Sequence, residues 1–544
     1  MHQSELRESD EVDVVIVGAG PSGGMAAKHL AANGFSVICL EQGEWVDHNA
    51  FVGARPEGEL LAAGRWHVNP NVRQLESDYP INDSEADCLP IMYNAVGGST
   101  VLWGAAWHRF KPSDFAVKSL DGAAEDWPFG YEDLVPFYEE AEAHMGVSGM
   151  DGDPAYPAPH RYPMPALPIG KTGTKMAAAM NRLGWHWWPG SNAIPSRPYR
   201  HLAACARLGV CLTGCPEGAK SVADKVFWLD AVSAGVRLAT GARVREVEVN
   251  DGGLATGVVY VNRRGEERRQ KAKQVILCAN GIGTARLLLL SKSKRFPHGL
   301  ANSSGLVGRN LMTHPLGLVI GTFDEPLQSW VGPAGQPIYS MEFYETDKSR
   351  GFIRGAKWNL YPSGGPLASH PGLQGAPFEF GWGANLHRTM RQSLGRSILW
   401  AINGEELPIA ENRVMLDDEL TDSDGIPSVK VIYRLEPNGV ALRKWHAAKA
   451  AESLREAGAN NVMEIPVVPN SGAHLLGTAR MGLHRDSSVC DQWGATHDVR
   501  NLHIYDGSLF VTSSGVNPTA TICAVASRCV QHLIKMRRDQ KVAA

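Results

Sequence analysis

The first clear feature in the pattern of apolar and polar residues is the run VDVVIV at Val12–Val17, which is typical of a buried parallel strand. A helical pattern covers residues 22–33, and Gly34 follows it as the kind of residue that ends many helices. The next apolar run, SVICL, predicts a second strand that ends at Glu41. The chain therefore opens with strand, helix and strand, which is the order of a βαβ unit.

Two later segments repeat the order of strand, turn and helix. Residues 274–290, QVILCANGIGTARLLLL, predict a strand, a turn at Gly281 and Gly283, and a helix. Near the C-terminus, NLHIYDGSLF predicts a strand that ends at Asp506 and Gly507, and PTATICAVASRCVQHLIKM predicts the last helix. We therefore expect one nucleotide-binding fold assembled from pieces at both ends of the chain.

The middle of the chain has a different pattern. Residues 150–200 are rich in Pro and Trp, and residues 325–437 contain alternating segments such as SVKVIYRL. Alternation of this kind predicts an antiparallel sheet with long loops. The expected fold is an α/β Rossmann-like domain assembled from discontinuous segments, plus an inserted α+β domain with an antiparallel sheet. We assign 10–60, 88–130, 201–322 and 465–540 to the nucleotide-binding domain, and 131–200 and 323–464 to the inserted domain.

Composition and charge exclude several classes of protein for this chain. The chain has 544 residues, too many for one ordinary hydrophobic core, which agrees with two domains. Its 53 Lys and Arg against 57 Asp and Glu give a formal net charge of −4, so we expect no nucleic-acid partner. Apolar runs stay well short of the roughly 18 residues that a membrane-spanning helix needs, so no transmembrane segment is expected. The first residues are polar and acidic and lack the features of a signal peptide.

The turn after the first strand reads GAGPSG and places Gly18, Gly20 and Gly23 in the spacing G-x-G-x-x-G. Glycines at these positions allow a tight turn and a close approach of the backbone to a pyrophosphate at the start of the helix. Glu41 lies 18 residues beyond Gly23, where a carboxylate can accept hydrogen bonds from both ribose hydroxyls. These features predict a dinucleotide-binding site, although the motif alone does not separate FAD from NAD.

Four segments together resemble the glucose–methanol–choline (GMC) flavoprotein oxidoreductases. They are VIVGAGPSG with LEQG, AVGGSTVLWG at residues 95–104, GLVGRNLMTHP at residues 305–315, and SGAHLLGTARMG with NLHIYDGSLFVTSSGVNPTATICAVA near the C-terminus. They span nearly the whole chain in the order of the family. The resemblance implies that the dinucleotide is FAD, that the inserted domain binds substrate, and that an alcohol is oxidised by hydride transfer to flavin N5.

This chemistry needs a base that takes the hydroxyl proton. In the family a His on the AHLLGT-type segment does so, and the matching residue here is His474; Asn517, in GVNPT, stands where the family has a second His or an Asn that orients the substrate oxygen. The nominal pKa of a histidine is about 6.5, and only the neutral ring can accept a proton. We therefore expect activity to rise as the pH increases through the pKa of His474. His108, His314 and His484 are expected to be structural, with His484 as the alternative base.

The resemblance also places a loop beside the flavin ring, at Gly97, Gly98 and Ser99, where small residues allow a close approach. Some relatives attach FAD through a His that precedes the Trp of this segment. Leu102 stands at that position, before Trp103, and cannot form the bond, so FAD is expected to be non-covalent. The full set of expected cofactor contacts is Gly18, Gly20, Gly23, Glu41, Gly97, Gly98, Ser99, Asp506, Gly507 and Asn517.

Three of the nine cysteines, Cys205, Cys211 and Cys215, are spaced C-x5-C-x3-C in a segment at about 201–220. Thiolates this close together suit a soft metal, and His201 is a candidate fourth ligand. The segment resembles that of the catalytic subunits of bacterial FAD-dependent glucose dehydrogenases, which implies a [3Fe–4S] cluster. The alternatives are a zinc site, reduced thiols in a loop and one incidental disulfide. Four further cysteines in apolar segments are expected to be small core residues: Cys39, Cys278, Cys523 and Cys529.

A one-electron relay beside a flavin favours a dehydrogenase that passes electrons to an external acceptor such as a cytochrome c. The resemblance further implies a small companion subunit, often the bearer of the export signal, so the compartment stays open between co-export to the periplasm and the cytoplasm. The expected substrate is a small carbohydrate, oxidised at C1 of an aldose or C3 of a glycoside. The alternatives are an oxidase that uses O2 and has structural cysteines, and a non-enzymatic flavin-binding subunit. Four tryptophans are candidates for stacking on sugar rings: Trp330, Trp358, Trp382 and Trp400.

Overall fold

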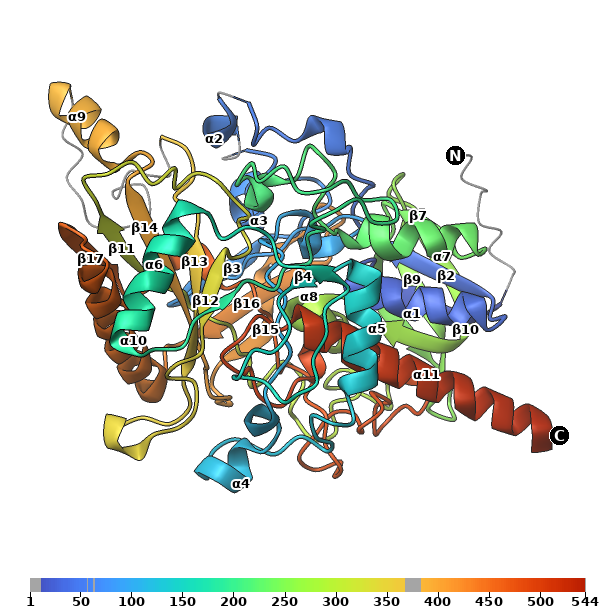
Figure 1. Ribbon diagram of the computed structural model, residues 1–544. Helices are drawn as coiled ribbons and strands as arrows, with labels where there is room; N and C mark the ends of the chain where they lie inside the picture. Colours follow the sequence, from blue (N-terminus) through green and yellow to red (C-terminus); the bar gives the residue numbers. More distant parts are fainter. Residues whose placement is uncertain (1–10, 56, 62–63, 367–382, 544) are drawn as a thin grey trace.

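A computed structural model describes residues 11–55, 57–61, 64–366 and 383–543 of the chain (Figure 1). Trp382 lies outside the described residues. Two large sheets organise the fold. Figure 1 shows β2 (Val37–Glu41) and β10 (Glu267–Leu277) on one side of the molecule, and β11 (Gly317–Thr322), β13 (Ala356–Tyr361) and β14 (Ser397–Gly404) on the other. The expected fold class, a Rossmann-like α/β domain combined with an antiparallel sheet, is confirmed.

The nucleotide-binding sheet has seven strands in the order β7-β2-β1-β10-β9-β8, with β18 paired to β10. Its parallel part consists of β7 (Arg237–Thr240), β2 (Val37–Glu41), β1 (Val12–Val17), β10 (Glu267–Leu277) and β18 (Leu502–Ile504); β9 (Ala255–Val261) and β8 (Arg243–Val249) complete it in antiparallel pairing. Strands from residues 12 to 504 thus form one sheet, as the scattered motifs predicted. Val14, Val15 and Ile16 are fully buried at its centre, which explains the uninterrupted apolar run.

Helix α1 (Pro21–Ala32) follows β1 directly, and Gly34 takes the left-handed conformation, with φ of +70°, that the sequence predicted at its end. It packs against α11 (Thr519–Ala543), which in turn contacts α5 (Val135–Met145). Figure 1 shows these three helices side by side over the strands. The last helix of the chain therefore covers the first βαβ unit.

The predicted turn at Gly281 and Gly283 is wrong, because both residues lie in the first turns of α8 (Asn280–Leu290). A Cβ on Gly281 would lie 2.5 Å from the carbonyl oxygen of Leu475. The glycine thus serves a close approach of the helix to another backbone segment, not a reversal of the chain. This approach brings the segment that contains His474 against the start of α8.

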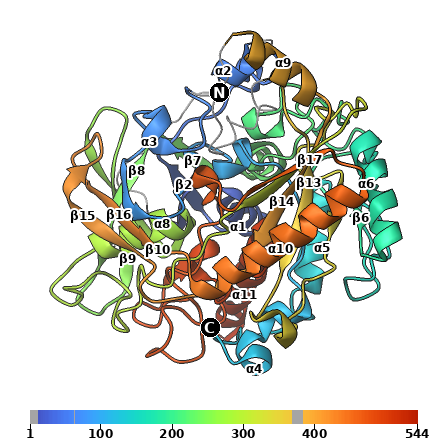
Figure 2. The same ribbon diagram turned by 90° about the vertical axis from the view of Figure 1, so that its left-hand side faces the viewer.

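The antiparallel sheet has six strands in the order β17-β11-β14-β13-β12-β6. They are β17 (Asn461–Ile465), β11 (Gly317–Thr322), β14 (Ser397–Gly404), β13 (Ala356–Tyr361), β12 (Ile338–Ser340) and β6 (Trp188–Pro189). Helices α10 (Pro437–Glu456) and α6 (Gly170–Leu183) cover one face, and Figure 2 shows α10 crossing in front of β14. Side chains alternate between the two faces of a sheet along each strand. Every second residue therefore packs under the helices, and the residues between them point to the opposite face, towards the rest of the molecule.

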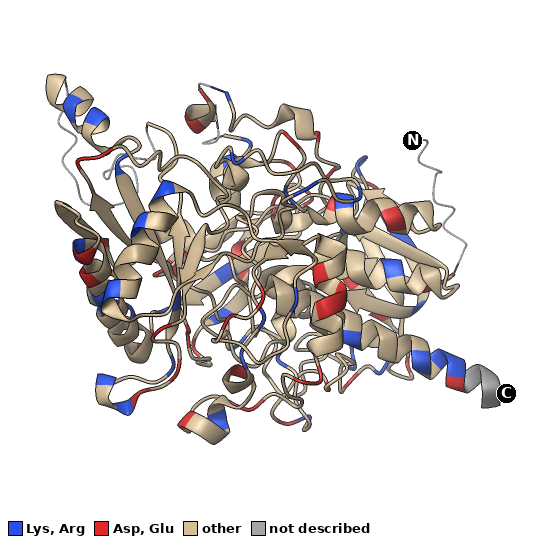
Figure 3. Cartoon of the chain, in the orientation of Figure 1, with Lys and Arg blue, Asp and Glu red and all other residues tan. Residues whose placement is uncertain are grey.

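A third sheet joins β15 (Arg413–Thr421), β16 (Pro427–Tyr433) and β3 (Ile81–Ala86), and β15 and β16 pack on α8. The alternating segment SVKVIYRL is β16, which pairs in parallel with β3 and in antiparallel with β15. The segment boundaries assigned to the two domains stay a prediction. Basic and acidic residues are interspersed over the chain (Figure 3), and no helix within the described ranges combines the length and apolarity needed to span a membrane.

Candidate active site

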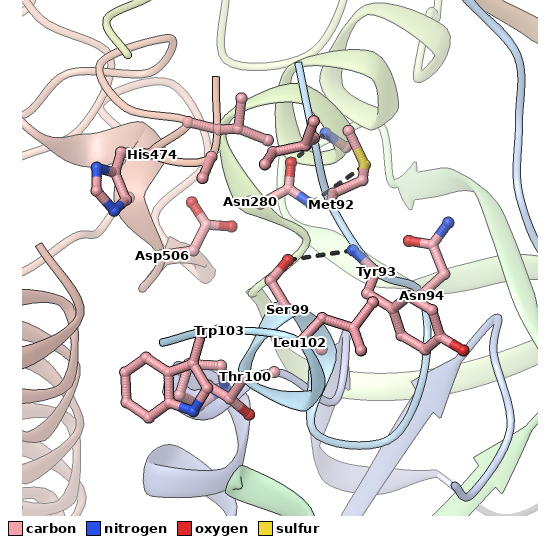
Figure 4. A pocket seen from close by; sticks show the side chains of 18 of the residues that line it. Met92, Tyr93, Asn94, Ser99, Thr100, Leu102, Trp103, Asn280, His474 and Asp506 are labelled. Carbon is pink, nitrogen blue, oxygen red and sulfur yellow. Dashed lines mark hydrogen bonds between the residues drawn. The ribbon is translucent and has the colours of Figure 1, made fainter. Parts of the chain in front are cut away.

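A cavity of about 590 Å³ is lined by residues from both large sheets. Figure 4 shows His474 and Asp506, from C-terminal segments, together with Ser99, Leu102 and Trp103 from the loop that precedes them in the sequence. Eight of the expected cofactor contacts line the cavity: Gly18, Gly20, Glu41, Gly98, Ser99, Asp506, Gly507 and Asn517. The structure therefore brings together residues separated by up to five hundred positions in the chain, while their roles as cofactor contacts stay a prediction.

The glycine turn has the space and the strain that a nucleotide-binding turn requires. Gly18 has φ of +100°, and a Cβ there would lie 2.5 Å from the carbonyl oxygen of Cys278. A Cβ on Gly23 would lie 2.2 Å from the carbonyl oxygen of Gly18, so only glycine permits this packing. At Gly20, by contrast, no described atom lies within 4 Å of such a Cβ, and no described side chain caps α1. The open helix terminus fits a pyrophosphate, as FAD binding demands.

Glu41 stabilises this turn and faces the cavity. Its two carboxylate oxygens accept hydrogen bonds from the backbone N–H of Ala19, at 2.7 Å, and of Gly43, at 2.8 Å. Burial raises the pKa of Glu41 to about 7, against the lowering effect of these two bonds. Each oxygen keeps a second lone pair, so the carboxylate can also accept from ribose hydroxyls.

Glu41→Ala is expected to weaken FAD binding by about 1.5–3 kcal/mol, or roughly 10–150-fold in Kd, because a charge-assisted hydrogen bond is lost. Acid precipitation measures how much flavin each variant retains, since it releases any FAD that is not covalently attached. Glu44→Ala is the matched control, because the Glu44 side chain is 51% exposed and pairs with Arg263. Equal retention by both variants would contradict the role of Glu41, and a yellow pellet would contradict non-covalent binding.

The loop expected beside the flavin ring meets the glycine turn. Gly98 has φ of +56°, and a Cβ there would lie 3.1 Å from the Cα of Gly20. The N–H of Gly97, which has φ of +102°, donates to the carbonyl oxygen of Ala19 at 2.9 Å. Both glycines thus hold the loop against the turn, and the larger side chains of other residues would separate the two.

The rest of this loop forms an apolar wall of the cavity. Ser99 Oγ accepts a hydrogen bond from the N–H of Tyr93 at 3.2 Å (Figure 4), and the indole N–H of Trp103 donates to the carbonyl oxygen of Ser221 at 3.0 Å. Leu102 is buried and lines the cavity. Its hydrocarbon side chain supplies no nucleophile, in keeping with the expectation of non-covalent FAD.

Asp506 also lines the cavity, and hydrogen bonds within the protein hold its carboxylate in place. One carboxylate oxygen accepts from the N–H and hydroxyl of Ser508, and the other accepts from the hydroxyl of Thr284 at 2.6 Å. Burial raises its pKa from the ordinary value. A Cβ on Gly507 would lie 2.9 Å from the carbonyl oxygen of Leu475, so this glycine brings the Asp506 segment against the residue next to His474.

His474 and Asn517, predicted as the catalytic pair, meet in the cavity. Asn517 Nδ2 lies 3.4 Å from His474 Nε2. His314, which the sequence analysis regarded as structural, lies in the same site, with its Nδ1 2.6 Å from Nδ1 of His474. Its other ring nitrogen lies 2.7 Å from the carbonyl oxygen of Ser514. His314 was therefore missed, although its segment, GLVGRNLMTHP, was one of those that carried the family resemblance.

These contacts fix the tautomers of both imidazoles. The carbonyl oxygen of Ser514 can only accept, so His314 Nε2 carries a proton and its Nδ1 is the acceptor in the neutral ring. His474 Nδ1 must then be the donor in the short bond between the rings. The Nε2 atom of His474 therefore carries no proton, faces the cavity and accepts the long hydrogen bond from the Asn517 amide N–H, at 3.4 Å. That is the state a general base requires before it takes a proton.

The expected pKa of about 6.5 for His474 is wrong. Burial lowers the pKa of His474 well below that value, and the neighbouring His314 and Lys357 lower it further. Burial likewise lowers the pKa of His314 to about 4. Both rings are therefore neutral at physiological pH. His484, the alternative base of the sequence analysis, is exposed at the surface and is not placed to replace His474.

Lys357 is a second residue that the sequence analysis missed. It is fully buried on β13, and its Nζ donates to Oδ1 of Asn517 at 2.5 Å. This bond sets the orientation of the amide, which turns its N–H towards His474. Burial lowers the pKa of Lys357 well below the ordinary value. The Nζ of Lys357 also donates to Oε1 of Gln336 at 3.4 Å. The amide N–H of Gln336 in turn donates to His108, so a chain of hydrogen bonds leads from Asn517 away from the cavity.

The described tryptophans do not support the expectation of sugar stacking. Trp358 and Trp400 are fully buried under α10, where their indole N–H groups donate to His446 and Ser453. For these two the expectation is wrong, because the alternation along β13 and β14 turns them away from the cavity. Trp330 is 44% exposed, and it is absent from the described lining of the cavity.

Cys205, Cys211 and Cys215 line one small cavity of about 20 Å³. All nine cysteines are free, each within the described residues, and the four expected in the core are buried. Burial raises the pKa of Cys205 to about 11 and also raises that of Cys211. His201 faces Asp230, at 3.9 Å, and its side chain is 61% exposed. No group of three or more His, Cys, Asp or Glu side chains in the described part of the chain is arranged to hold a single metal ion.

A buried lysine joins this cysteine loop to the wall of the large cavity. Lys220 Nζ donates to the carbonyl oxygens of Val101, Trp103 and Cys211 at 2.8, 3.0 and 2.5 Å. Burial lowers its pKa to about 8. The lysine thus ties the backbone beside Leu102 to that of Cys211, so the two cavities share one wall.

The Rossmann-like sheet with its glycine turn and the half-buried imidazole–amide pair in the cavity are the features of a flavin-dependent oxidoreductase. Models of protein families agree: an FAD binding domain matches residues 11–50, and two GMC oxidoreductase models match residues 170–316 and 408–526. The chain belongs to the GMC oxidoreductases, and it is an FAD oxidoreductase that acts on CH–OH donors of the alcohol or sugar type.

Individual relatives cover the whole chain. It is 38% identical to 2-methyl-1,2-propanediol dehydrogenase of Mycolicibacterium austroafricanum, over 98% of this chain and 96% of that protein. It is 30% identical to the fructose dehydrogenase large subunit of Gluconobacter japonicus, over 97% of this chain and 98% of that one. The crystal structure of pyridoxine 4-oxidase from Mesorbium loti superposes with a TM-score of 0.66 at 17% identity, over 96% and 98% of the two chains, which shows the shared fold.

Proposed function

We propose that the protein is an FAD-dependent dehydrogenase that oxidises a hydroxyl of a sugar, glycoside or related polyol and passes the electrons to an external acceptor. The observation that carries the proposal is the chain of contacts from Ser514 through His314 to His474, which leaves His474 Nε2 without a proton beside Asn517, in a cavity that also has a nucleotide-binding turn. The names of two relatives, a diol dehydrogenase and a fructose dehydrogenase, support a polyhydroxylated substrate.

When bound, FAD supplies the hydride acceptor for the carbinol carbon. The residues of the chain manage the proton and the position of the substrate. His474 Nε2 takes the proton of the hydroxyl, and the positive charge that develops on the ring is shared with His314 through the bond between their Nδ1 atoms. The Asn517 amide, held by Lys357, donates to the substrate oxygen and orients it.

The cysteine loop is proposed to hold a [3Fe–4S] cluster. Three buried or half-buried thiols face one cavity, which suits a site in which each thiolate binds a different iron. The shared wall at Lys220 supports electron transfer from the large cavity to this loop. The name of the fructose dehydrogenase large subunit supports a companion subunit, and a cytochrome c-type protein is the proposed acceptor.

An anaerobic panel of substrates tests this function. D-glucose, D-fructose, methyl glucosides and propane-1,2-diol should bleach the flavin, with turnover in the presence of an artificial electron acceptor, and NMR should identify the oxidised carbon. We expect little turnover with O2 as acceptor. Faster turnover with O2 would favour the oxidase, and a flavin that no alcohol bleaches would favour a non-enzymatic flavin-binding subunit.

A further inference from the structure

Two buried asparagines stand out on the face of the antiparallel sheet that points away from α10. Asn403, on β14, is fully buried and lines the large cavity, yet both polar atoms of its amide lack a hydrogen-bonding partner among the described residues. Asn359, on β13, is also fully buried, and its two amide atoms are unpartnered within the described chain as well. Buried amides are normally paired, because an unpaired one destabilises the folded protein.

The surroundings of these amides on the sheet are apolar. Leu399 and Ala401 belong to a small hydrophobic cluster on this face, and Tyr361, which lines the cavity, packs against the cluster. Burial raises the pKa of the Tyr361 hydroxyl to about 12, and the nearby Asn359 amide opposes this, although the pair does not reach hydrogen-bonding geometry. Unpaired amides in an apolar wall are typical of a surface that holds a polar ligand in a defined orientation.

The register of the strands places Asn403 beside the catalytic pair. Lys357 is the direct cross-strand partner of Asn403, and Asn359 is the partner of Ala401. Directly opposed side chains have Cβ atoms about 4.5–5.5 Å apart, and diagonal neighbours on a face are about 7–8 Å apart. Because Lys357 Nζ bonds to Asn517, the Asn403 amide lies one side chain away from the residue that orients the reacting hydroxyl.

We propose that Asn403 binds a second hydroxyl of the substrate, one that is not oxidised. The inference rests on the proposed function and specifies its substrate class: compounds with a hydroxyl on the carbon next to, or one removed from, the reacting carbinol, as in diols and sugars. An amide offers an acceptor oxygen and two donor hydrogens, which matches a hydroxyl that both donates and accepts. A site built for such a group discriminates against an analogue that lacks it, because the amide then stays unpaired.

The test uses Asn403→Leu in the FAD-loaded enzyme with matched substrates, propane-1,2-diol against propan-1-ol and D-glucose against 2-deoxy-D-glucose. The measured quantity is the rate constant of anaerobic flavin reduction divided by the dissociation constant of the substrate, for the pair of substrates that the parent prefers. The variant should lower this ratio by roughly 10–100-fold for the polyol of that pair. For the deoxy partner the ratio should fall by no more than about 3-fold. Equal losses for both members would overturn the proposal. If no polyol bleaches the flavin of the parent enzyme, the proposed function itself is wrong. That result is obtained with the parent alone, so it is distinguishable from a failure of the Asn403 proposal.

Stability supplies a second reading that does not depend on the substrate. Because its amide is unpaired, Asn403→Leu should leave the Tm of the protein without substrate unchanged or raise it. Asn412→Leu is the control: Asn412 is 2% exposed, and its amide exchanges two hydrogen bonds with the backbone of Arg434, at 2.8 and 3.0 Å. This control should lower the Tm. A comparable drop in Asn403→Leu would mean that the protein itself satisfies the amide, and the proposal would fail.

Discussion

His474→Ala is expected to slow anaerobic flavin reduction by roughly 10²–10⁴-fold, the usual contribution of a positioned general base. The hydrogen bonds that link Ser514 to His314 and His314 to His474 leave His474 Nε2 as the acceptor that faces the cavity, and alanine removes this acceptor. Substrate affinity should fall much less, because Asn517 and Lys357 remain in place. Stopped-flow absorbance of the flavin is the appropriate measurement, since it separates hydride transfer from any later electron transfer.

The pH dependence of the parent enzyme follows from the lowered pKa values. An imidazole with a lowered pKa is neutral at all higher pH values, so the base is ready wherever the pH exceeds that pKa. The pKa of His474 lies well below 6.5 and that of His314 lies at about 4. The rate constant of flavin reduction should therefore be flat around neutral pH and fall only in acid well below pH 6.5. An inflection at or above that value would contradict the burial that lowers the pKa.

His484→Ala provides the control for His474→Ala, because His484 is exposed and outside the cavity. It should reduce the flavin at the parental rate. Reduction of the flavin by His474→Ala at a rate close to that of the parent would show that another group takes the proton. Lys357 is the next candidate in that case, since its buried amine lies beside Asn517 and burial lowers its pKa well below the ordinary value.

Much of the nucleotide-binding fold is predictable from the sequence because its signals are local. A fully buried strand, a glycine turn and a helix occur in one continuous segment from Val12 to Ala32, and the acid at Glu41 ends the next strand. The same holds for the C-terminal strand and helix. Gly281 shows the limit of this approach: the same glycine that permits a turn also permits a close approach between two backbones, and only the position of Leu475 decides between them.

The catalytic neighbourhood was only partly predictable, for a related reason. His474 and Asn517 were found through the resemblance of their segments to a family, whereas the roles of His314 and Lys357 depend on which residues meet in space. Both faces of β13 are buried, so its alternation of Lys and Asn with Trp and Leu did not reveal which face borders the cavity. The polar residues proved to face the active site, and the tryptophans proved to face the helices.

Cys211→Ser is expected to abolish the reduction of cytochrome c while leaving flavin bleaching intact. The residues proposed for hydride transfer line the large cavity, whereas the three cysteines line the separate small cavity across the wall held by Lys220. In the proposed cluster, serine replaces a soft thiolate ligand of iron, so the variant should also lose the broad visible absorbance beyond the flavin bands. The parent should contain about three iron and four sulfide per chain, as a [3Fe–4S] cluster requires.

Cys523→Ser is the matched control, because Cys523 is fully buried in α11 and belongs to the core. It should keep the iron, the absorbance and the transfer to cytochrome c. If Cys211→Ser folds and binds FAD but no longer bleaches in one anaerobic turnover, the separation between hydride transfer and relay is wrong. If Cys205→Ser, Cys211→Ser and Cys215→Ser all keep the iron content and absorbance of the parent, these thiols hold no cluster. The cysteines would then be structural, and the reading as an oxidase that delivers electrons to O2 would become the stronger one.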